Sequence, residues 1–339
     1  MTQQVQISVE GQMGVIALNR PEAINALSHE MITAIADALT RWANDPAIRA
    51  VLFEGRGSRG FCAGGDVRAV RTAVLAGELA AADAFFVAEY AMNGQIAGYG
   101  KPVVAITHGV VMGGGIGVAG HARYRFTLPD ARFAMPEAAI GFTCDVGVNA
   151  ILRKAPLQRA LLFELSGVPV NAADALALGL TDCAVLPERL AAVRDAVVAA
   201  ASAPHVDAAL ASLMAAESIQ AGERELCDLA DRLEPILLAS QVEEIVAGIA
   251  AAQDVPPELV RQLSSRSPTS QEAILRGHLA ARRAGDLQSI LQMDLKLSHF
   301  LARFPDFAEG VRAVLVDKDH APTWQLKVPK QEIAELVAV

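Results

Sequence analysis

Two acidic residues near the middle of the chain have the types and the spacing expected of an acid–base pair. Glu137 lies in residues 136–141, which read as one helical turn with a proline at its start and a glycine just past its end. Asp145 follows eight residues later, in a loop of the kind that carries catalytic groups on α/β scaffolds. Carboxylates that lie close together have pKa values pushed apart, which gives one base and one acid or proton-sharing partner. A structural alternative stays open, because Glu137 suits a helix N-terminus and Asp145 is a good N-cap.

A third carboxylate, Glu89, stands on an apolar stripe. Phe85, Glu89, Met92 and Ile96 follow a spacing of four, three and four residues, which places them on one face of a helix. A carboxylate buried among apolar side chains needs a partner or a purpose. The structural alternative is that Glu89 lies at the edge of the stripe and reaches water.

Two glycine-rich segments, residues 60–66 and 109–115, each separate strand-like from helix-like residues. Helix N-termini expose unpaired N–H groups, which hold anions and developing oxyanions, and glycine lets a ligand approach the backbone closely. Two such turns can direct two donors at one carbonyl oxygen, and losing one donor of this kind typically costs about 2.7–4 kcal/mol of barrier lowering. The structural alternative is that the glycines only allow tight packing of strand on helix.

Nucleotide-binding motifs fit these segments poorly. Asp66 and Val67 stand where a phosphate loop carries Lys and Ser or Thr. Residues 115–120 match GxGxxG literally, but they begin well after the strand expected near Ile106, and a lone match is a weak signal.

The elements that must position these residues alternate between strand and helix in the first half of the chain. A hairpin is expected from residues 5–9 and 15–18, and a helix over residues 25–42 with Ser28 as its cap. The repetition of strand, glycine turn and helix predicts an α/β core of stacked similar units. The remaining expected elements are strands at 50–53, 103–106, 123–128 and 132–134, and helices from 67, from 116, over 171–179 and over 188–201.

The character of the chain changes near Pro204. Strand signals vanish beyond it, and helical periodicity dominates to Arg303. Ser267 and Pro268 are expected to start one helix, while Gly277 and Gly285 are expected to punctuate later segments. We therefore predict a core over residues 1–204 and a helical region over residues 205–339.

Composition limits the function classes. The net charge is −9, with acidic and basic residues mixed, which argues against a nucleic-acid surface. The four cysteines form no CxxC pair and no secretory segment is seen, so we expect reduced thiols and a cytoplasmic protein. The sequence has no uncharged apolar run of about 18 residues, so no membrane span is expected. The histidines lack a metal-binding spacing, so no metal is expected.

Taken together, these segments resemble the crotonase (enoyl-CoA hydratase/isomerase) superfamily over roughly residues 5–200. The signatures are residues 19–21 with 25–27, then 61–66, 108–115 and 135–137. Within the superfamily the chain is most similar to the 3-hydroxyisobutyryl-CoA hydrolase family. That similarity extends through nearly the whole chain, in residues 62–68, 133–137, 145–147, 267–270, 306–313, 317–319 and Trp324.

The resemblance implies a spiral of ββα units with a helical C-terminal region that completes the acyl pocket. It implies hydrolysis of 3-hydroxyisobutyryl-CoA, a step of valine catabolism, with no separate cofactor because coenzyme A is part of the substrate. The oxyanion donors would be the N–H groups of Gly65 and Gly114. Glu137 and Asp145 match the catalytic pair, and Glu89 matches a substrate-contacting glutamate. Arg56 and Arg59 are candidates to meet the phosphates of coenzyme A.

One position separates this reaction from hydration. Hydratases of the superfamily carry a second glutamate three residues after the second oxyanion glycine, where this chain has Gly117. The chain also departs from the hydrolase pattern, since residues 142–144 before Asp145 lack the usual proline and residues 148–149 lack the usual glycines. The acyl group can therefore differ from that of the family. An enoyl-CoA hydratase or isomerase, and a catalytically silent binding protein, remain the alternatives, and both a monomer and a homo-oligomer stay open.

Overall fold

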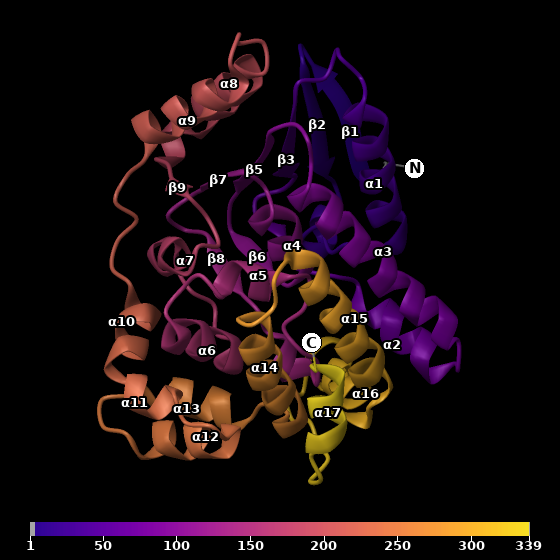
Figure 1. The fold of residues 1–339 in the computed structure, drawn as a ribbon, viewed down its shortest axis with the longest axis vertical. Helices are drawn as coiled ribbons and strands as arrows, with labels where there is room; N and C mark the ends of the chain where they lie inside the picture. Colours follow the sequence, from indigo (N-terminus) through magenta and orange to yellow (C-terminus); the bar gives the residue numbers. More distant parts are fainter. Residues whose placement is uncertain (1–3, 339) are drawn as a thin grey trace. The chain divides into compact units, whose positions relative to one another are not determined.

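The computed structural model describes residues 4–338, which form two compact units (Figure 1). The first unit takes the described residues of Met1–Gly65 with Ala91–Phe133 and Asn171–Arg224, and the second takes Asp66–Tyr90, Ala134–Val170 and Glu225–Val339 up to residue 338. Each compact unit combines three segments that are separated in the sequence. The boundary expected at residue 204 remains a prediction.

The first unit is built on a six-stranded sheet in the order β1-β2-β3-β5-β7-β9. The first two strands form the predicted antiparallel hairpin, with Val5 opposite Leu18, and each later pair is parallel. The strands are β1 (Val5–Glu10), β2 (Met13–Leu18), β3 (Ala50–Gly55), β5 (Val103–Thr107), β7 (Tyr124–Thr127) and β9 (Cys183–Ala184).

A second sheet of three short strands has the order β4-β6-β8, formed by β4 (Gly60–Cys62), β6 (Val110–Met112) and β8 (Arg132–Ala134). The expectation that residues 60–66 and 109–115 are turns throughout is therefore wrong, because each segment begins with a strand. The two strands pair in parallel, with Gly60 opposite Val110 and Cys62 opposite Val111. This pairing brings two glycine segments, fifty residues apart in the sequence, side by side.

The helices of the first unit start and end where local chemistry dictates. Ser28 accepts a hydrogen bond from the Met31 N–H at the start of α1 (His29–Ala43), so the predicted cap is confirmed. Residues 25–28, which the expected helical stripe included, lie before α1, and Asn25 has φ 55°. Also in this unit are η1 (Pro21–Ala23), α4 (Gly114–Gly120), α7 (Ala172–Leu178), η3 (Pro187–Arg189), α8 (Leu190–Ala200) and α9 (Val206–Glu217).

The core of the first unit lies between the six-stranded sheet and α8 and α9. Buried Val15, Leu52 and Val104 of the sheet belong to one cluster with Val197 and Leu210 of these helices. Burial of such side chains is the main force that holds helices on a sheet.

The second unit is mainly helical, and residues 205–338 contain no strand, as predicted. Helix α3 (Leu79–Ala97) begins in this unit, and Ser267 caps α14 as expected. Gly277 was expected to interrupt a helix, but it lies inside α14, whereas Gly285 lies in the connection after it. The other helices are α2 (Val67–Leu75), η2 (Glu137–Ile140), α5 (Val148–Leu152), α6 (Leu157–Ser166), α10 (Glu225–Arg232), α11 (Glu234–Leu237), α12 (Val242–Ala251), α13 (Pro257–Ser264), α14 (Pro268–Ala281), α15 (Leu287–Arg303), α16 (Pro305–Val311), the π-helix η4 (Arg312–Val316) and α17 (Lys330–Leu336).

The cysteines and the helix lengths bear on two of the expectations from composition. Cys62, Cys144, Cys183 and Cys227 are buried and form no disulfide. None of the helices within residues 4–338 combines the length and the apolar character that crossing a membrane requires.

Candidate active site

The first glycine turn is fixed by Asn25. The side-chain amide of Asn25 donates hydrogen bonds to the carbonyl oxygens of Arg56 and Phe61, both at 3.0 Å. The N–H of Leu27 donates to the carbonyl oxygen of Gly64 at 2.8 Å. Asn25 is fully buried, so these bonds replace those it would make with water. The segment before α1 therefore holds the turn that contains Gly64 and Gly65 in one conformation.

The second glycine turn packs backbone to backbone against the first. A Cβ added at Gly115 would lie 2.6 Å from the carbonyl oxygen of Cys62, so only glycine fits there. Gly64 has φ +111°, and a Cβ at this position would lie 3.6 Å from the Gly114 nitrogen. The two turns therefore lie backbone to backbone within the first unit.

The main-chain N–H groups of Gly65 and Gly114 make no hydrogen bond with any group in residues 4–338. Gly114 is the first residue of α4, where the helix supplies no acceptor for its N–H. Gly114 is buried and Gly65 is partly buried. Native structures rarely leave a buried backbone N–H unpaired, so the Gly114 donor in particular is suited to an external oxygen, with the Gly65 donor beside it. Their role as an oxyanion hole stays a prediction.

Three carboxyl groups expected from the sequence are buried in the second unit. Glu89 on α3 is 2% exposed, Asp145 is 5% exposed and Glu137, the first residue of η2, is 7% exposed. The alternative in which Glu89 reaches water is therefore wrong. Oε1 of Glu89 and Oε2 of Glu137 have no hydrogen-bond partner within the described chain. Unpaired buried oxygens of this kind are costly for folding unless a ligand uses them.

Asp145 is held by a tyrosine and caps no helix. The N-cap of α5 is Gly147, without a side-chain hydrogen bond, so the capping alternative for Asp145 is wrong. The Tyr90 hydroxyl donates to Oδ2 of Asp145 at 2.5 Å, and Oγ of Ser298 lies 2.5 Å from the same hydroxyl. The carboxylate is thereby fixed by side chains from α3 and α15.

The electrostatic setting of the three carboxyl groups favours their neutral forms. Burial raises the pKa of Asp145 to about 7, and the hydrogen bond from Tyr90 opposes this rise. Burial, and after it the charge of Asp145, raises the pKa values of Glu137 and Glu89 well above the usual range for glutamate. Asp145, whose pKa lies near neutrality, is thereby suited to exchange protons in acid–base catalysis.

Another buried carboxyl group, that of Asp294, was not predicted from the sequence. Its Oδ2 accepts a hydrogen bond from the Gly147 N–H at 2.8 Å, and it is 1% exposed. Burial raises the pKa of Asp294, the charge of Asp145 adds to the rise, and the Gly147 bond opposes it. Asp294 and Ser298 are four residues apart on the buried side of α15. This polar pair on an apolar face is the same signal that identified Glu89, and it could have been found.

The C-terminal run folds back onto η2 within the second unit, as the resemblance implied. A Cβ at Gly141, which has φ +70°, would lie 2.3 Å from the backbone carbon of Asp306. The ring of Phe307 lies 5.4 Å from that of Phe142, which stacks at 5.3 Å on Phe86. These contacts fix the loop between Glu137 and Asp145, although the shaping of an acyl pocket stays a prediction.

The two arginines considered for coenzyme A phosphates already have partners in the first unit. Arg56 forms an ion pair with Glu54 at 3.1 Å. Arg59 donates to the carbonyl oxygens of Pro21 at 2.5 Å and Glu22 at 2.6 Å. Their binding of phosphates stays a prediction.

Comparisons with known proteins cover nearly the whole chain. The family model described as Enoyl-CoA hydratase/isomerase matches residues 13–338. Human mitochondrial 3-hydroxyisobutyryl-CoA hydrolase is 33% identical over 327 residues, which cover 95% of this chain and 84% of the relative. The hydrolase of the same name from Xenopus tropicalis is 36% identical over 319 residues, which cover 93% of this chain and 82% of the relative.

Solved structures share the fold. A structure described as a carnitinyl-CoA dehydratase from Mycobacterium thermoresistibile has a TM-score of 0.90 and 35% identity, covering 100% of this chain and 97% of the other. An enoyl-CoA hydratase from Rhodobacter sphaeroides has a TM-score of 0.89 and 31% identity, covering 99% and 97%. The α/β fold with a helical C-terminal region, predicted from the sequence, is thereby confirmed as that of the crotonases.

Proposed function

Since the chain belongs to the enoyl-CoA hydratase/isomerase family, we propose that it hydrolyses acyl-CoA thioesters, with 3-hydroxyisobutyryl-CoA as its substrate. The observation that carries the proposal is the buried Glu137 carboxyl group, whose Oε2 is unpaired and whose pKa burial raises. Curated relatives that match nearly the full chain bear the name of this hydrolase, which supports the choice of acyl group.

The glycine turns supply the first part of the chemistry. As water adds to the thioester carbon, negative charge develops on the carbonyl oxygen. The N–H groups of Gly65 and Gly114 are unpaired within residues 4–338 and donate to that oxygen. Preformed donors stabilise the transition state without reorganisation, and each is worth about 2.7–4 kcal/mol.

Glu137 supplies the second part. The ionised form of Glu137, which its raised pKa makes a stronger base, takes a proton from water as the water oxygen attacks the thioester carbon. The carbon–sulfur bond then breaks, and the proton passes to the departing coenzyme A thiolate, which leaves 3-hydroxyisobutyrate and free thiol. Direct attack by Glu137, through an acyl anhydride that water then cleaves, gives the same products.

The two neighbouring carboxyl groups have distinct roles in this proposal. Asp145, oriented by Tyr90, holds the water and adjusts the basicity of Glu137 through its charge. Oε1 of Glu89 is buried and has no partner in the described chain, so it is free to accept the hydrogen bond of the 3-hydroxyl group. A substrate without that hydroxyl leaves Glu89 unsatisfied, which makes the hydroxyl a source of specificity.

Hydration is the competing activity, because two solved relatives are described as a dehydratase and a hydratase. Helix α4 (Gly114–Gly120) has no acidic residue, and Gly117 occupies the place where hydratases of the superfamily carry their second glutamate. Addition of water to a double bond uses two carboxylates, that of Glu137 and that of the second glutamate. Thioester hydrolysis as proposed does not need the second glutamate.

The proposal is tested by following thiol release from 3-hydroxyisobutyryl-CoA and from isobutyryl-CoA, beside loss of enoyl absorbance from crotonyl-CoA. We expect rapid thiol release only from the hydroxylated thioester and no loss of absorbance. Glu137→Gln should reduce kcat by a factor of about 100 or more while folding is retained. Glu188→Gln, at an exposed position, is the matched control. Hydration of crotonyl-CoA, or no turnover of any thioester, would overturn the proposal in favour of a hydratase or a silent binding protein.

A further inference from the structure

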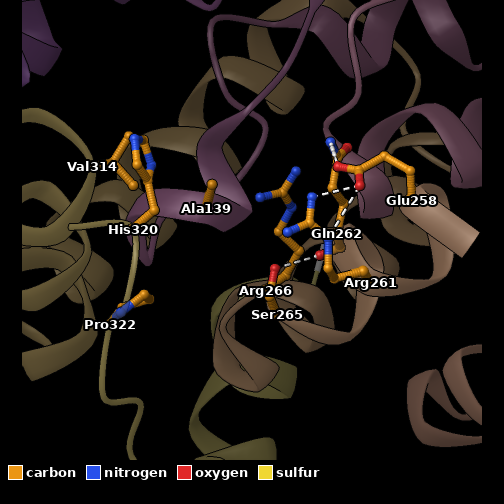
Figure 2. Close-up of a pocket in the computed structure, with 9 residues that line it drawn as sticks. All are labelled: Ala139, Glu258, Arg261, Gln262, Ser265, Arg266, Val314, His320 and Pro322. Carbon is orange, nitrogen blue, oxygen red and sulfur yellow. Dashed lines mark hydrogen bonds and ion pairs between the residues drawn. The ribbon is translucent and has the colours of Figure 1, made fainter. Parts of the chain in front are cut away.

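A pocket of about 540 Å³ lies in the second unit, lined by parts of η2, of α13 and of the C-terminal segment (Figure 2). Its volume falls within the range of pockets that bind small molecules. Ser265, one of the lining residues, accepts a hydrogen bond on its carbonyl oxygen from the ring N–H of Trp324 at 2.9 Å. The residues that matter for recognition are Arg261, Arg266, His320, Ala139, Val314 and Pro322.

Arg266 carries an unpaired positive charge into this pocket. Its Nε donates to the carbonyl oxygen of Ser166 at 2.8 Å. Its two terminal nitrogens have no partner within residues 4–338, and no carboxylate forms an ion pair with it there. Burial lowers the pKa of Arg266, and no neighbouring negative charge offsets this effect. A guanidinium group has five N–H donors in a rigid fork, so most of its donors remain for a ligand.

The other charged side chains of the pocket neutralise one another. Arg261 donates through Nε to Oε2 of Glu258 at 3.1 Å, and Gln262 donates to Oε1 of the same carboxylate at 2.7 Å. Both oxygens of Glu258 thus have partners, and within residues 4–338 no ion pair joins this carboxylate to Arg266. With Arg261 and Glu258 paired, the lining retains one net positive charge from Arg266, and the ring nitrogens of His320 add further polar groups.

The remaining wall is apolar. Ala139, Val314 and Pro322 are all partly buried and line the pocket together with the arginines. Figure 2 shows Val314 and His320 across the pocket from Arg261 and Arg266. A cationic fork opposite small apolar side chains suits a ligand with an oxyanion at one end and a compact apolar body at the other.

We propose that this pocket binds a small organic anion, whose carboxylate or phosphate group forms a bidentate pair with Arg266 and whose apolar body contacts Val314 and Pro322. Ala139 belongs to η2, and the Ser267 N–H donates to the Ala138 carbonyl oxygen at 3.1 Å. The bound anion thus contacts the short helix that begins at Glu137. Binding here does not require thioester hydrolysis and concerns residues outside the proposed catalytic set.

Calorimetric titration of the full chain with benzoate, phenyl phosphate and uncharged benzamide tests the proposal. We expect at least one of the two anions to bind, and benzamide to bind at least about tenfold more weakly, because it cannot form a charge-assisted bidentate pair with Arg266. The relative affinities of benzoate and phenyl phosphate tell whether the pocket prefers a carboxylate or a phosphate.

Variants assign the binding to the pocket. Arg266→Gln should lower the affinity for the anion by about tenfold or more. Arg266→Lys, which keeps the charge but loses the fork, should fall between this variant and the wild type. Arg283→Gln is the control, because Arg283 is exposed and does not line the pocket. Circular dichroism establishes that each variant is folded. The proposal is overturned if neither anion binds the wild type, or if Arg266→Gln binds as tightly as Arg283→Gln.

Discussion

The hydroxyl of Tyr90 lies 2.5 Å from Oδ2 of Asp145, and both groups are buried. This hydrogen bond lowers the pKa of Asp145 against the rise that burial causes, to a net value of about 7. Tyr90 thus acts on the proposed chemistry through Asp145, as a positioning residue. The relationship joins residues 55 positions apart in the sequence.

Replacing Tyr90 by Phe should move the ionisation of Asp145 to higher pH. The variant loses the opposing hydrogen bond, so the pKa of Asp145 rises further. We expect the acid limb of the kcat/KM profile to shift upward and kcat at neutral pH to fall about tenfold. Ser298→Ala keeps the bond between Tyr90 and Asp145 and should shift the profile less. An unchanged pH profile in Tyr90→Phe, measured by thiol release, would contradict the role of Tyr90.

Asp145→Asn should change how stability depends on pH. The pKa of Asp145 is about 7 in the folded protein and near 3.8 in the unfolded chain. Between these values the folded state holds a proton that the unfolded state has lost, so stability is full below pH 3.8 and declines as pH rises towards 7. Asparagine does not titrate and escapes this decline.

Urea unfolding at pH 5 and pH 8 measures the effect. The free energy of unfolding of Asp145→Asn relative to wild type should increase from the lower to the higher pH. The increase should be about 1.4 kcal/mol for each pH unit between pH 5 and the folded-state pKa of Asp145. Asp195→Asn, at an exposed position, should show no such trend. A difference that stays constant across pH would mean that Asp145 is ionised in the folded state throughout.

Gly115→Ala should disturb the packing of the two glycine turns. Its Cβ would meet the carbonyl oxygen of Cys62 at 2.6 Å, so the backbones must separate. We expect a loss of about 1–3 kcal/mol in the free energy of unfolding and a marked loss of thiol release. Gly100→Ala has open space around its new methyl group and should stay within about 0.5 kcal/mol of wild type. Equal behaviour of the two variants in thermal unfolding and activity would refute the close approach.

Ser267→Ala should destabilise the protein more than loss of an ordinary helix cap. Ser267 accepts a hydrogen bond from the Ser270 N–H and donates to Oδ2 of Asp306 at 2.6 Å, in a fully buried setting. The cap Asp286 accepts the corresponding bond from the Ser289 N–H, but at an exposed position. We expect a loss of about 1 kcal/mol for Asp286→Ala and about 2 kcal/mol or more for Ser267→Ala, measured by chemical unfolding. A larger loss of unfolding free energy for Asp286→Ala than for Ser267→Ala would show that the bond between Ser267 and Asp306 adds no stability.

Local chemistry made much of the fold predictable. The caps Ser28 and Ser267 and the helix between Asn171 and Gly179 each follow from a few neighbouring residues, and all three are confirmed. Strands β4 and β6 were not predicted, because their residues lie in glycine-rich segments that read as turns, whereas the equally short β8 was predicted. These strands exist through their mutual pairing, and that pairing cannot be seen within either segment.

The candidate site shows the same division. The unusual placement of Glu89 on an apolar face identified it without any knowledge of its neighbours. Asp145 looked like a helix cap because its sequence context is that of one, and only Tyr90 on a distant helix reveals its environment. Asp294 accepts a hydrogen bond from the N–H of Gly147, which lies 147 residues away in the sequence. Contacts of this range depend on how helices pack, and sequence spacing does not encode them.

The left-handed backbone of Asn25 has a consequence for turnover. Two consecutive residues, Ile24 and Asn25, take positive φ, and the buried amide of Asn25 holds the neighbouring loop in place. The entropy lost in ordering that loop is therefore spent once, when the chain folds, and not again each time a ligand arrives. In the proposed mechanism the amide groups of this loop are fixed in advance, so we expect no closing motion of the loop to limit the catalytic cycle.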